Sequence, residues 1–313
     1  MKRRSFVVGA AACASSAALA SRTAFTQSGK PVFLDYSQEQ LDQAYDQSVW
    51  APQVNELLAY DASSSAAVRK TMPPRTVRYG KSEIEQADIF AAPNARGAPV
   101  LVYIHGGAWI LNSRLDASFP APTVVGRGAI HFVPDYANAK QARLPEMIEQ
   151  VRGAVEWAVR NAASFGGDPG RVYIAGHSSG GHLASCALIT DWAGRGLPAD
   201  AIKGGLLMSG MFDLHPVALS SRNDYLKLTP EDVQAASAMR HLDRIACPIA
   251  IASADLDSPE FKRQSKVFAE ALAGMGRLAS HTIVFAANHF QEPQRLATPD
   301  SELSRALFSL MKI

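Results

Sequence analysis

The feature that most constrains the fold of this chain is the alternation of short apolar strands with helices over its later two thirds. Residues 99–104 form a continuous apolar run rich in β-branched side chains, which is typical of a strand covered on both faces. Because helices separate most of the later strands, the pattern predicts one α/β domain with a mostly parallel sheet and helices on both faces. The eight expected strands lie at 75–79, 86–91, 99–104, 129–133, 171–175, 204–208, 248–253 and 281–286.

The expected helices complete this domain. A capping box at Ser37–Gln40 begins the first, and a stripe of apolar residues marks a long helix over 145–165. Others are expected at 179–190, 260–273 and 301–311. The polar stretch 212–242 is a candidate cap or lid. Since no repeat or linker divides the chain, residues 28–313 are predicted to form a single domain.

The N-terminus, residues 1–27, is predicted to hold an export signal peptide and the start of the mature chain. Lys2, Arg3 and Arg4 precede a short apolar run of small residues. The paired arginines followed by Ser-Phe-Val resemble a twin-arginine signal, so the expected location is the bacterial periplasm or the outside. A membrane anchor is disfavoured because residues 6–20 are fewer than the ~20 that span a bilayer. A lipoprotein with lipidated Cys13 is also disfavoured, since Ala is a weak choice three places before it.

Composition excludes several classes of function. About 47% of the 313 residues are hydrophobic and 19% are charged, as in ordinary globular proteins with a sizeable core. The net charge is +2 and no basic run lies outside the N-terminus, so no nucleic-acid partner is expected. Cys186 and Cys247 fall in apolar elements, which favours two buried free thiols over a bridge. No Cys/His spacing suggests a metal, and no cofactor is expected.

The strongest chemical signal is Gly176-His177-Ser178-Ser179-Gly180, which lies between an expected strand and an expected helix. This context predicts a nucleophile elbow, in which flanking glycines permit a strained turn that presents the Ser178 hydroxyl. His177 occupies the variable position of the elbow and is expected to shape the substrate pocket rather than titrate.

A serine nucleophile needs a base that is held by a carboxylate, in the chain order Ser, acid, His for this type of fold. His289 follows the final strand in a loop and is the predicted base. The acid should follow the strand at 248–253, and chain order alone leaves Asp255 and Asp257 as equal candidates.

An earlier strand ends in His105-Gly106-Gly107-Ala108-Trp109. At this position, backbone N–H groups that glycine leaves unobstructed supply one half of an oxyanion hole. Gly106 or Gly107 is therefore predicted to act with the N–H of Ser179. Trp109 is predicted to line the acyl or leaving-group pocket.

These residues together resemble the α/β-hydrolase superfamily and, within it, the arylformamidase (kynurenine formamidase) group. Further blocks extend the resemblance over nearly all of the mature chain: Phe165–Pro169, Gly210–Leu214, Asn223-Asp224, Leu228-Thr229, Glu231-Asp232, Asp257–Phe261, Arg263–Ser265 and His289-Phe290. The resemblance assigns the acid to Asp257, because the family's acidic residue matches the Asp of the Asp-Ser-Pro-Glu-Phe run. The chain departs from the family pattern at Ala108, Ser179, Ala238 and Gln291. None of these positions belongs to the triad.

The resemblance and the motifs together imply a serine hydrolase that cleaves a small ester or an activated, arylformamide-like amide through an acyl-enzyme. The alternatives are a periplasmic carboxylesterase or lipase of the hormone-sensitive-lipase type, a transacylase, and a non-enzymatic binding module on the same scaffold. A third glycine usual in lipases of that type is absent at Ala108. The expected partner is a small ester or amide molecule. No stable membrane insertion is expected after signal cleavage, and a homodimer is possible.

Overall fold

A computed structural model describes residues 29–313, so the predicted export signal lies outside the described residues. One sheet of eight strands forms the centre of the domain, in the order β1-β2-β4-β3-β5-β6-β7-β8. The strands from β4 to β8 along this order are parallel, and only β1 and β2 run antiparallel to their neighbours. The predicted mostly parallel, eight-stranded sheet is confirmed. The strands are β1 (Arg75–Arg78), β2 (Gln86–Phe90), β3 (Ala98–Ile104), β4 (Ile130–Pro134), β5 (Gly167–His177), β6 (Gly205–Met208), β7 (Ile249–Ala254) and β8 (Leu278–Val284).

Burial along the strands follows their place in the sheet. The inner strands β3, β4, β6 and β7 are buried at every position, as their continuous apolar sequences predict. The edge strand β8 alternates between exposed and half-buried positions until Val284. At the opposite edge, β1 carries the exposed Arg75 and Arg78, and charges of this kind discourage edge-to-edge pairing with another chain.

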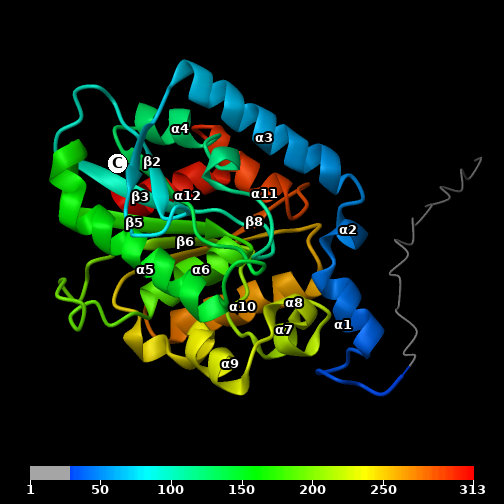
Figure 1. The fold of residues 1–313 in the computed structure, drawn as a ribbon. Coiled ribbons are helices and arrows are strands. Elements are labelled where there is room, and N and C mark those ends of the chain that lie inside the picture. Colours follow the sequence, from blue (N-terminus) through cyan, green and yellow to red (C-terminus); the bar gives the residue numbers. More distant parts are fainter. Residues whose placement is uncertain (1–28) are drawn as a thin grey trace, which may run out of the picture.

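Helices cover both faces of the sheet, as Figure 1 shows. One face packs against α5 (Leu144–Asn161), α6 (Ser179–Leu188) and α10 (Pro259–Gly274), and the other against α4 (Ala121–Gly126) and α12 (Glu302–Met311). Two apolar clusters result, one on each side of the sheet. The expected two-sided α/β arrangement is therefore present.

The segment that precedes the sheet contains three helices: α1 (Gln38–Tyr45), α2 (Gln47–Trp50) and α3 (Val54–Thr71). The predicted capping box at Ser37 is present, with both of its reciprocal bonds to Gln40. The long helix α3 was not predicted, because it has no apolar stripe and Ser65 is its only buried residue. Polar contacts hold it instead: Ser65 Oγ accepts the N–H groups of Ser118 and Phe119 at 3.1 Å each.

Residues 212–242, the candidate cap, fold into short helices beside α1 and α5. These are α7 (His215–Leu219), α8 (Asn223–Leu226), α9 (Pro230–Ala236) and the 3-10 turn η3 (Ala238–Arg240). The remaining elements are α11 (Gln291–Gln294) and the 3-10 turns η1 (Arg114–Asp116), η2 (Ala162–Phe165), η4 (Leu242–Arg244) and η5 (Arg295–Ala297). Cys186 and Cys247 are buried free thiols, as expected. Within the described range, no helix combines the length and apolar character that crossing a membrane requires.

Candidate active site

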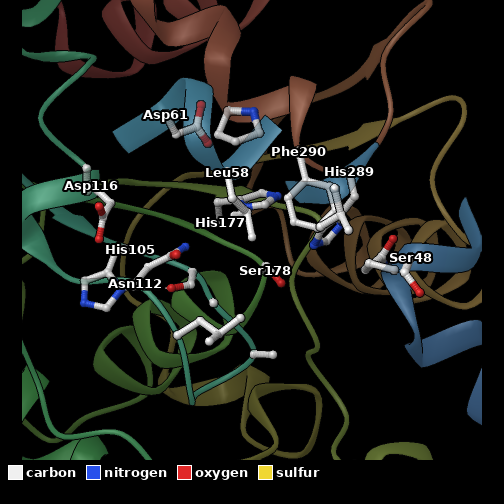
Figure 2. A pocket seen from close by; sticks show the side chains of 18 of the residues that line it. Ser48, Leu58, Asp61, His105, Asn112, Asp116, His177, Ser178, His289 and Phe290 are labelled. Atoms are coloured by element: carbon white, nitrogen blue, oxygen red, sulfur yellow. Dashed lines mark hydrogen bonds between the residues drawn. The ribbon is translucent and has the colours of Figure 1, made fainter. Parts of the chain in front are cut away.

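The parallel strands bring the predicted catalytic residues to one edge of the sheet. Because β3, β5, β7 and β8 run in the same direction, the loops that follow them open at the same edge. Gly106, Ser178, Asp257 and His289 lie in those loops. Figure 2 shows Ser178 and His289 facing the cavity at this edge. Residues separated by up to 183 positions in the sequence, Gly106 to His289, therefore meet in one site.

Ser178 sits in the strained turn that its glycine-flanked sequence predicts. Its backbone has φ 56° and ψ −124°, a conformation that a side chain strongly disfavours. The turn is tight enough to exclude side chains on both flanks. A Cβ on Gly176 would lie 2.3 Å from the carbonyl oxygen of Gly180, and one on Gly180 would lie 2.2 Å from that of Ile104. The bond from Ser178 N–H to the Met208 carbonyl, 2.9 Å long, fixes the turn to β6.

His289 and Asp257 form a buried pair behind this turn. The Nδ1 of His289 lies 2.8 Å from Asp257 Oδ2, and both residues are at least 98% buried. The other carboxylate oxygen accepts bonds from the Ser258 N–H at 2.7 Å and from Gln47 Nε2 at 3.1 Å. Since the carboxylate engages Nδ1, the nitrogen of His289 that remains for chemistry is Nε2.

The geometry distinguishes the two acids that chain order left equal. The Oδ1 of Asp255 accepts the backbone N–H of Ala287 at 3.2 Å. This bond braces the loop that carries His289. Asp257, the residue that the family resemblance favoured, is the one in contact with the imidazole.

The loop after β3 lies directly against Ser178. A Cβ on Gly106 would stand 2.9 Å from the carbonyl oxygen of His177 and 3.3 Å from Ser178 Cβ. Gly107 has φ 120°, and a Cβ there would lie 2.1 Å from the carbonyl oxygen of Leu111. Glycine is therefore required at both positions. At Gly106 the reason is the close approach, and at Gly107 it is the close approach together with the positive φ.

Two tyrosines hold this loop from either side. Tyr136 stacks on the ring of His105, with centroids 4.4 Å apart, and its hydroxyl donates to the His105 carbonyl at 2.6 Å. Tyr225, from the 212–242 segment, donates its hydroxyl to the Ala108 carbonyl at 3.1 Å. The backbone carbonyls of His105 and Ala108, which flank the Gly-Gly pair, thus each accept a hydrogen bond from a tyrosine hydroxyl.

A cavity of about 380 Å³ covers these groups. Gly106, Gly107, His177, Ser178 and His289 all line it. Its other walls come from the segments around α2, α3 and α8, which contribute Gln47, Ser48, Val54, Leu58, Asp61, Ser221, Arg222 and Tyr225. In the view of Figure 2, Asp61 and Asp116 lie on one side of Ser178 and Ser48 on the other. The cavity is large enough for a small aromatic ester or amide.

The structure corrects the expected place of Trp109. Its ring is 99% buried and packs edge-on against His182, with centroids 5.3 Å apart, and the residue does not line the cavity. The cause is the loop backbone, which takes positive φ values at Ala108 and Trp109 and turns the indole into the core. Ala108 lines the cavity in its place.

His177 lines the cavity, as expected, and its ring lies 4.5 Å from that of His289. Burial, together with the neighbouring His289, holds the pKa of His177 well below its ordinary value. Behind it lies the fully buried Glu292, whose Oε2 is 3.9 Å from His177 Nε2. Burial is the main cause that raises the pKa of Glu292 far above its ordinary range, and the charge of Asp257 adds to it. Both shifts favour the neutral form of the group.

Several residues of the site had no signal in the sequence. Gln47, Asp61 and Arg222 reach the cavity from helices or turns that pack over the sheet edge rather than from strand ends. Burial raises the pKa of Asp61 to about 7, against a hydrogen bond from Gln294 that lowers it. Neighbouring residues in the sequence do not place these three at the cavity, because their contacts are with residues far away along the chain. Residues 29–313 contain no group of three or more side chains of the kinds that hold a metal ion.

Known proteins resemble this chain over most of its length. A family model described as BD-FAE matches residues 87–193, and one described as the carboxylesterase family matches residues 149–238. A kynurenine formamidase of Danio rerio is 30% identical over 288 residues, which cover 88% of this chain and 97% of the relative.

Solved structures share the fold. One from Silicibacter sp. superposes with a TM-score of 0.75 at 24% identity and covers 85% of this chain and 98% of its own. The esterase of Pyrobaculum calidifontis gives a TM-score of 0.65 at 19% identity, with 85% of this chain and 97% of its own covered.

Proposed function

The chain belongs to the kynurenine formamidase family of α/β-hydrolases, and on this premise we propose that it is a serine hydrolase of small esters and activated, arylformamide-like amides. The observation that carries the proposal is the buried Asp257–His289 pair, 2.8 Å across, whose imidazole lines the same cavity as a serine on a strained turn. An imidazole held by a carboxylate is the base that a neutral hydroxyl nucleophile requires.

The proposed reaction begins when Ser178 Oγ attacks the carbonyl carbon and His289 Nε2 takes the hydroxyl proton. Asp257 holds the ring by Nδ1 and stabilises the imidazolium that forms. The C–O or C–N bond to the leaving group breaks as His289 returns the proton to it, which leaves the acyl group on Ser178. Water, deprotonated by the same nitrogen, then attacks the acyl carbon. The bond to Ser178 Oγ breaks as His289 returns the proton to that oxygen, and the acid is released.

The negative oxygen of the tetrahedral intermediate is proposed to rest on the N–H of Ser179 and on that of Gly106 or Gly107. Ser179 begins α6, so its N–H lies at the positive end of that helix. The close approach of the glycine loop to Ser178 supports the second donor. A substrate carbonyl bonded to Ser178 Oγ would lie between the backbone of this loop and the backbone of the Ser178 turn.

A carboxylesterase is the second candidate, favoured by the match of residues 149–238 to the carboxylesterase family. The two candidates share the mechanism and differ in the leaving group. Purified protein should be offered matched aryl acetates and formanilides, and the ratio of their kcat/KM values assigns the preference.

The test of the mechanism is Ser178→Ala combined with fluorophosphonate labelling. We expect the substitution to lower kcat by about 10⁶-fold, as for other serine hydrolases, and to abolish labelling. Ser179→Ala, at the adjacent hydroxyl, is the matched control, because its backbone N–H is retained. A Ser178→Ala protein that hydrolyses 4-nitrophenyl acetate at the wild-type rate would remove Ser178 from the mechanism.

We also propose that the protein acts after export, in the periplasm or outside the cell. The support is the charged, then apolar, N-terminal sequence of residues 1–27, with Arg3 and Arg4 in the twin-arginine position. Replacing both arginines by lysine should retain the protein in the cytoplasm, which fractionation and immunoblotting would detect. Unchanged export of the doubly substituted protein would reject this route.

A further inference from the structure

A network of charged side chains, made of Arg69, Asp88, Arg114 and Asp135, runs beside the glycine loop of the active site. Asp88 lies in β2 and is fully buried, and Asp135 follows β4 and is 3% exposed. Arg114, at the start of η1, joins the two carboxylates. Its Nε lies 3.2 Å from Asp88 Oδ2, and its Nη1 binds Asp135 Oδ2. Its backbone N–H also donates to Asp135 Oδ1 at 2.6 Å.

The end of this network that is remote from the active site is anchored in α3 and β1. Arg69 Nη1 donates to Asp88 Oδ2 at 2.5 Å, and Thr76 Oγ1 donates to Asp88 Oδ1 at 2.6 Å. Asp88 thus has three side-chain partners, the third being Arg114. From Asp88 the contacts pass through Arg114 to Asp135, so Asp88 stands two steps further from the glycine loop than Asp135 does.

The other end of the network meets the ring of His105, the residue that precedes the two glycines. His105 Nε2 lies 3.6 Å from Asp135 Oδ1. Burial raises the pKa of Asp135, but the interactions with His105 and the hydrogen bonds from Arg114 outweigh it and hold this pKa below its ordinary value. The ionised form of Asp135 is therefore favoured, and it faces the imidazole.

His105 in turn orients a peptide group of the glycine loop. Its Nδ1 lies 2.9 Å from the carbonyl oxygen of Gly106, and Nδ1 is the donor because a carbonyl can only accept. The peptide bond between Gly106 and Gly107 is trans, so its N–H points opposite to its carbonyl. The N–H of Gly107 is thus directed away from the His105 ring. In Figure 2, Ser178 also lies away from that ring.

Stability alone is a weak reason to bury such a network. Charged groups lose their hydration when they are buried, and apolar side chains of similar volume are often as stable or more stable. What a charged network provides is direction, because a guanidinium binds carboxylates in a fixed geometry and a carboxylate fixes the imidazole that it faces. An oxyanion donor depends on direction, since it stabilises the transition state only if it is already in place when the charge develops.

Resting on the proposed hydrolase function, we infer that Arg114 and Asp135 are positioning residues for the oxyanion hole. Arg114 holds the Asp135 carboxylate, the carboxylate holds the His105 ring, and the ring holds the peptide that carries the Gly107 N–H. Neither Arg114 nor Asp135 lines the cavity, so both act through the loop and not on the substrate. Their contribution belongs to turnover rather than to substrate binding.

The test compares Asp135→Asn with Asp88→Asn, the same substitution on either side of Arg114. A network that only stabilised the fold would make Asp88→Asn the more harmful change, because Asp88 is fully buried and has three side-chain partners. Positioning predicts the reverse order. We expect Asp135→Asn to lower kcat for 4-nitrophenyl acetate by about 10- to 100-fold with little change in KM, and Asp88→Asn to lower it by less than about 3-fold.

Arg114 provides a second pair of variants. Arg114→Gln should lower kcat, and Arg114→Lys should recover part of the loss, since lysine keeps the charge but not the fork. The Ki of 2,2,2-trifluoroacetophenone reports on the oxyanion hole, because attack by a serine hydroxyl gives an adduct with a negative oxygen. This Ki should rise by the factor by which kcat/KM falls in each variant. Losses of kcat that follow the losses of Tm across the four variants, or a larger loss of kcat in Asp88→Asn than in Asp135→Asn, would overturn the inference.

Hydrogen exchange separates this inference from the proposed reaction. The backbone amides of residues 105–109 should exchange faster in Asp135→Asn than in wild type, and at the wild-type rate in Asp88→Asn. If no ester or amide is hydrolysed but exchange follows this order, the reaction is wrong and the positioning of the loop stands. If exchange of these amides is the same in Asp135→Asn as in wild type, the positioning is wrong whatever the catalytic result. Should Asp135→Asn not fold, Arg114→Lys is compared with Asp88→Asn in its place.

Discussion

Two regions enclose the active-site cavity, and they are built in different ways. The floor consists of the loops that follow β3, β5, β7 and β8 and carry the proposed catalytic groups. The roof consists of residues 45–61 and 221–225, which come from the helices packed over the sheet edge. In the floor, Ser178, Asp257 and His289 are buried, and the glycines leave no room for added atoms. Most of the residues in the roof are half-buried or exposed.

This difference separates chemistry from selectivity. Each floor position is determined by its own backbone: a strained turn at Ser178, a close approach at Gly106 and a positive φ at Gly107. In the roof, Asp61 and Arg222 belong to a helix and a turn that are separate from those loops. We conclude that the reaction is a property of the floor and that substrate choice is largely a property of the roof.

The largest effect that would sharpen this comparison is expected at the acid. Asp257→Asn should lower kcat by about 10⁴-fold, because an amide in this position favours the wrong tautomer of the imidazole. Asp255→Asn is the matched control on the same loop and should cost far less, since Asp255 bonds only to backbone near His289. Steady-state kinetics on one ester decides the point. Equal losses would mean that the loop, and not the contact with His289, carries the effect.

The second prediction concerns the glycine loop. Gly106→Ala should lower kcat by about 10²- to 10³-fold, the effect of losing an oxyanion donor, because its Cβ must displace the loop from His177 and Ser178. Gly126→Ala in α4 is the control, since no atom lies within 4 Å of its Cβ, and it should leave kcat unchanged. Kinetics combined with thermal unfolding separates loop displacement from loss of fold. Wild-type kcat in a folded Gly106→Ala protein would contradict the close packing of the floor.

The third prediction tests a roof residue that supports the floor. Gln47→Ala removes a 3.1 Å bond to Asp257, and a bond of this kind contributes about 1 kcal/mol. We expect kcat to fall by up to about 10-fold with little change in KM. Gln43→Ala, in α1, removes instead a bond to the exposed Glu39 and should have no effect. A change confined to KM would place Gln47 among the substrate contacts instead.

The smallest effect is expected at Asp61 and depends on pH. Because its folded pKa of about 7 lies above the ordinary value, the native state binds this proton more tightly than the unfolded state does. The stability that Asp61 contributes is therefore fully present below its ordinary pKa and is lost as the pH rises through about 7. Asp61→Asn should remove this dependence, so that chemical unfolding at pH 8 shows a more stable protein than wild type. Parallel pH profiles of the two proteins would exclude a raised pKa at Asp61.

The sequence predicted the floor and much of the fold, but little of the roof. The buried run at β3 and the Gly-His-Ser-Ser-Gly turn impose their structure locally, so pattern and motif suffice to place them. His289 and Asp257 needed chain order and family resemblance together. In contrast, α3 has no apolar stripe. Trp109 turns inward because Ala108 and Trp109 take positive φ values, which the residue types Ala and Trp do not predict. Long-range packing decides such features, and it cannot be read from neighbouring residues.

The bond from Gln47 to Asp257 joins residues that are 210 positions apart, and His289 completes the site still later in the chain. A ribosome synthesises the helix that carries Gln47 long before the strand that positions His289. The nascent polypeptide is therefore inert toward esters for almost the whole of its synthesis, and hydrolytic activity arises only when the two ends of the domain close on each other. Proteolytic loss at either end should abolish activity, because residues from both ends contribute to the site.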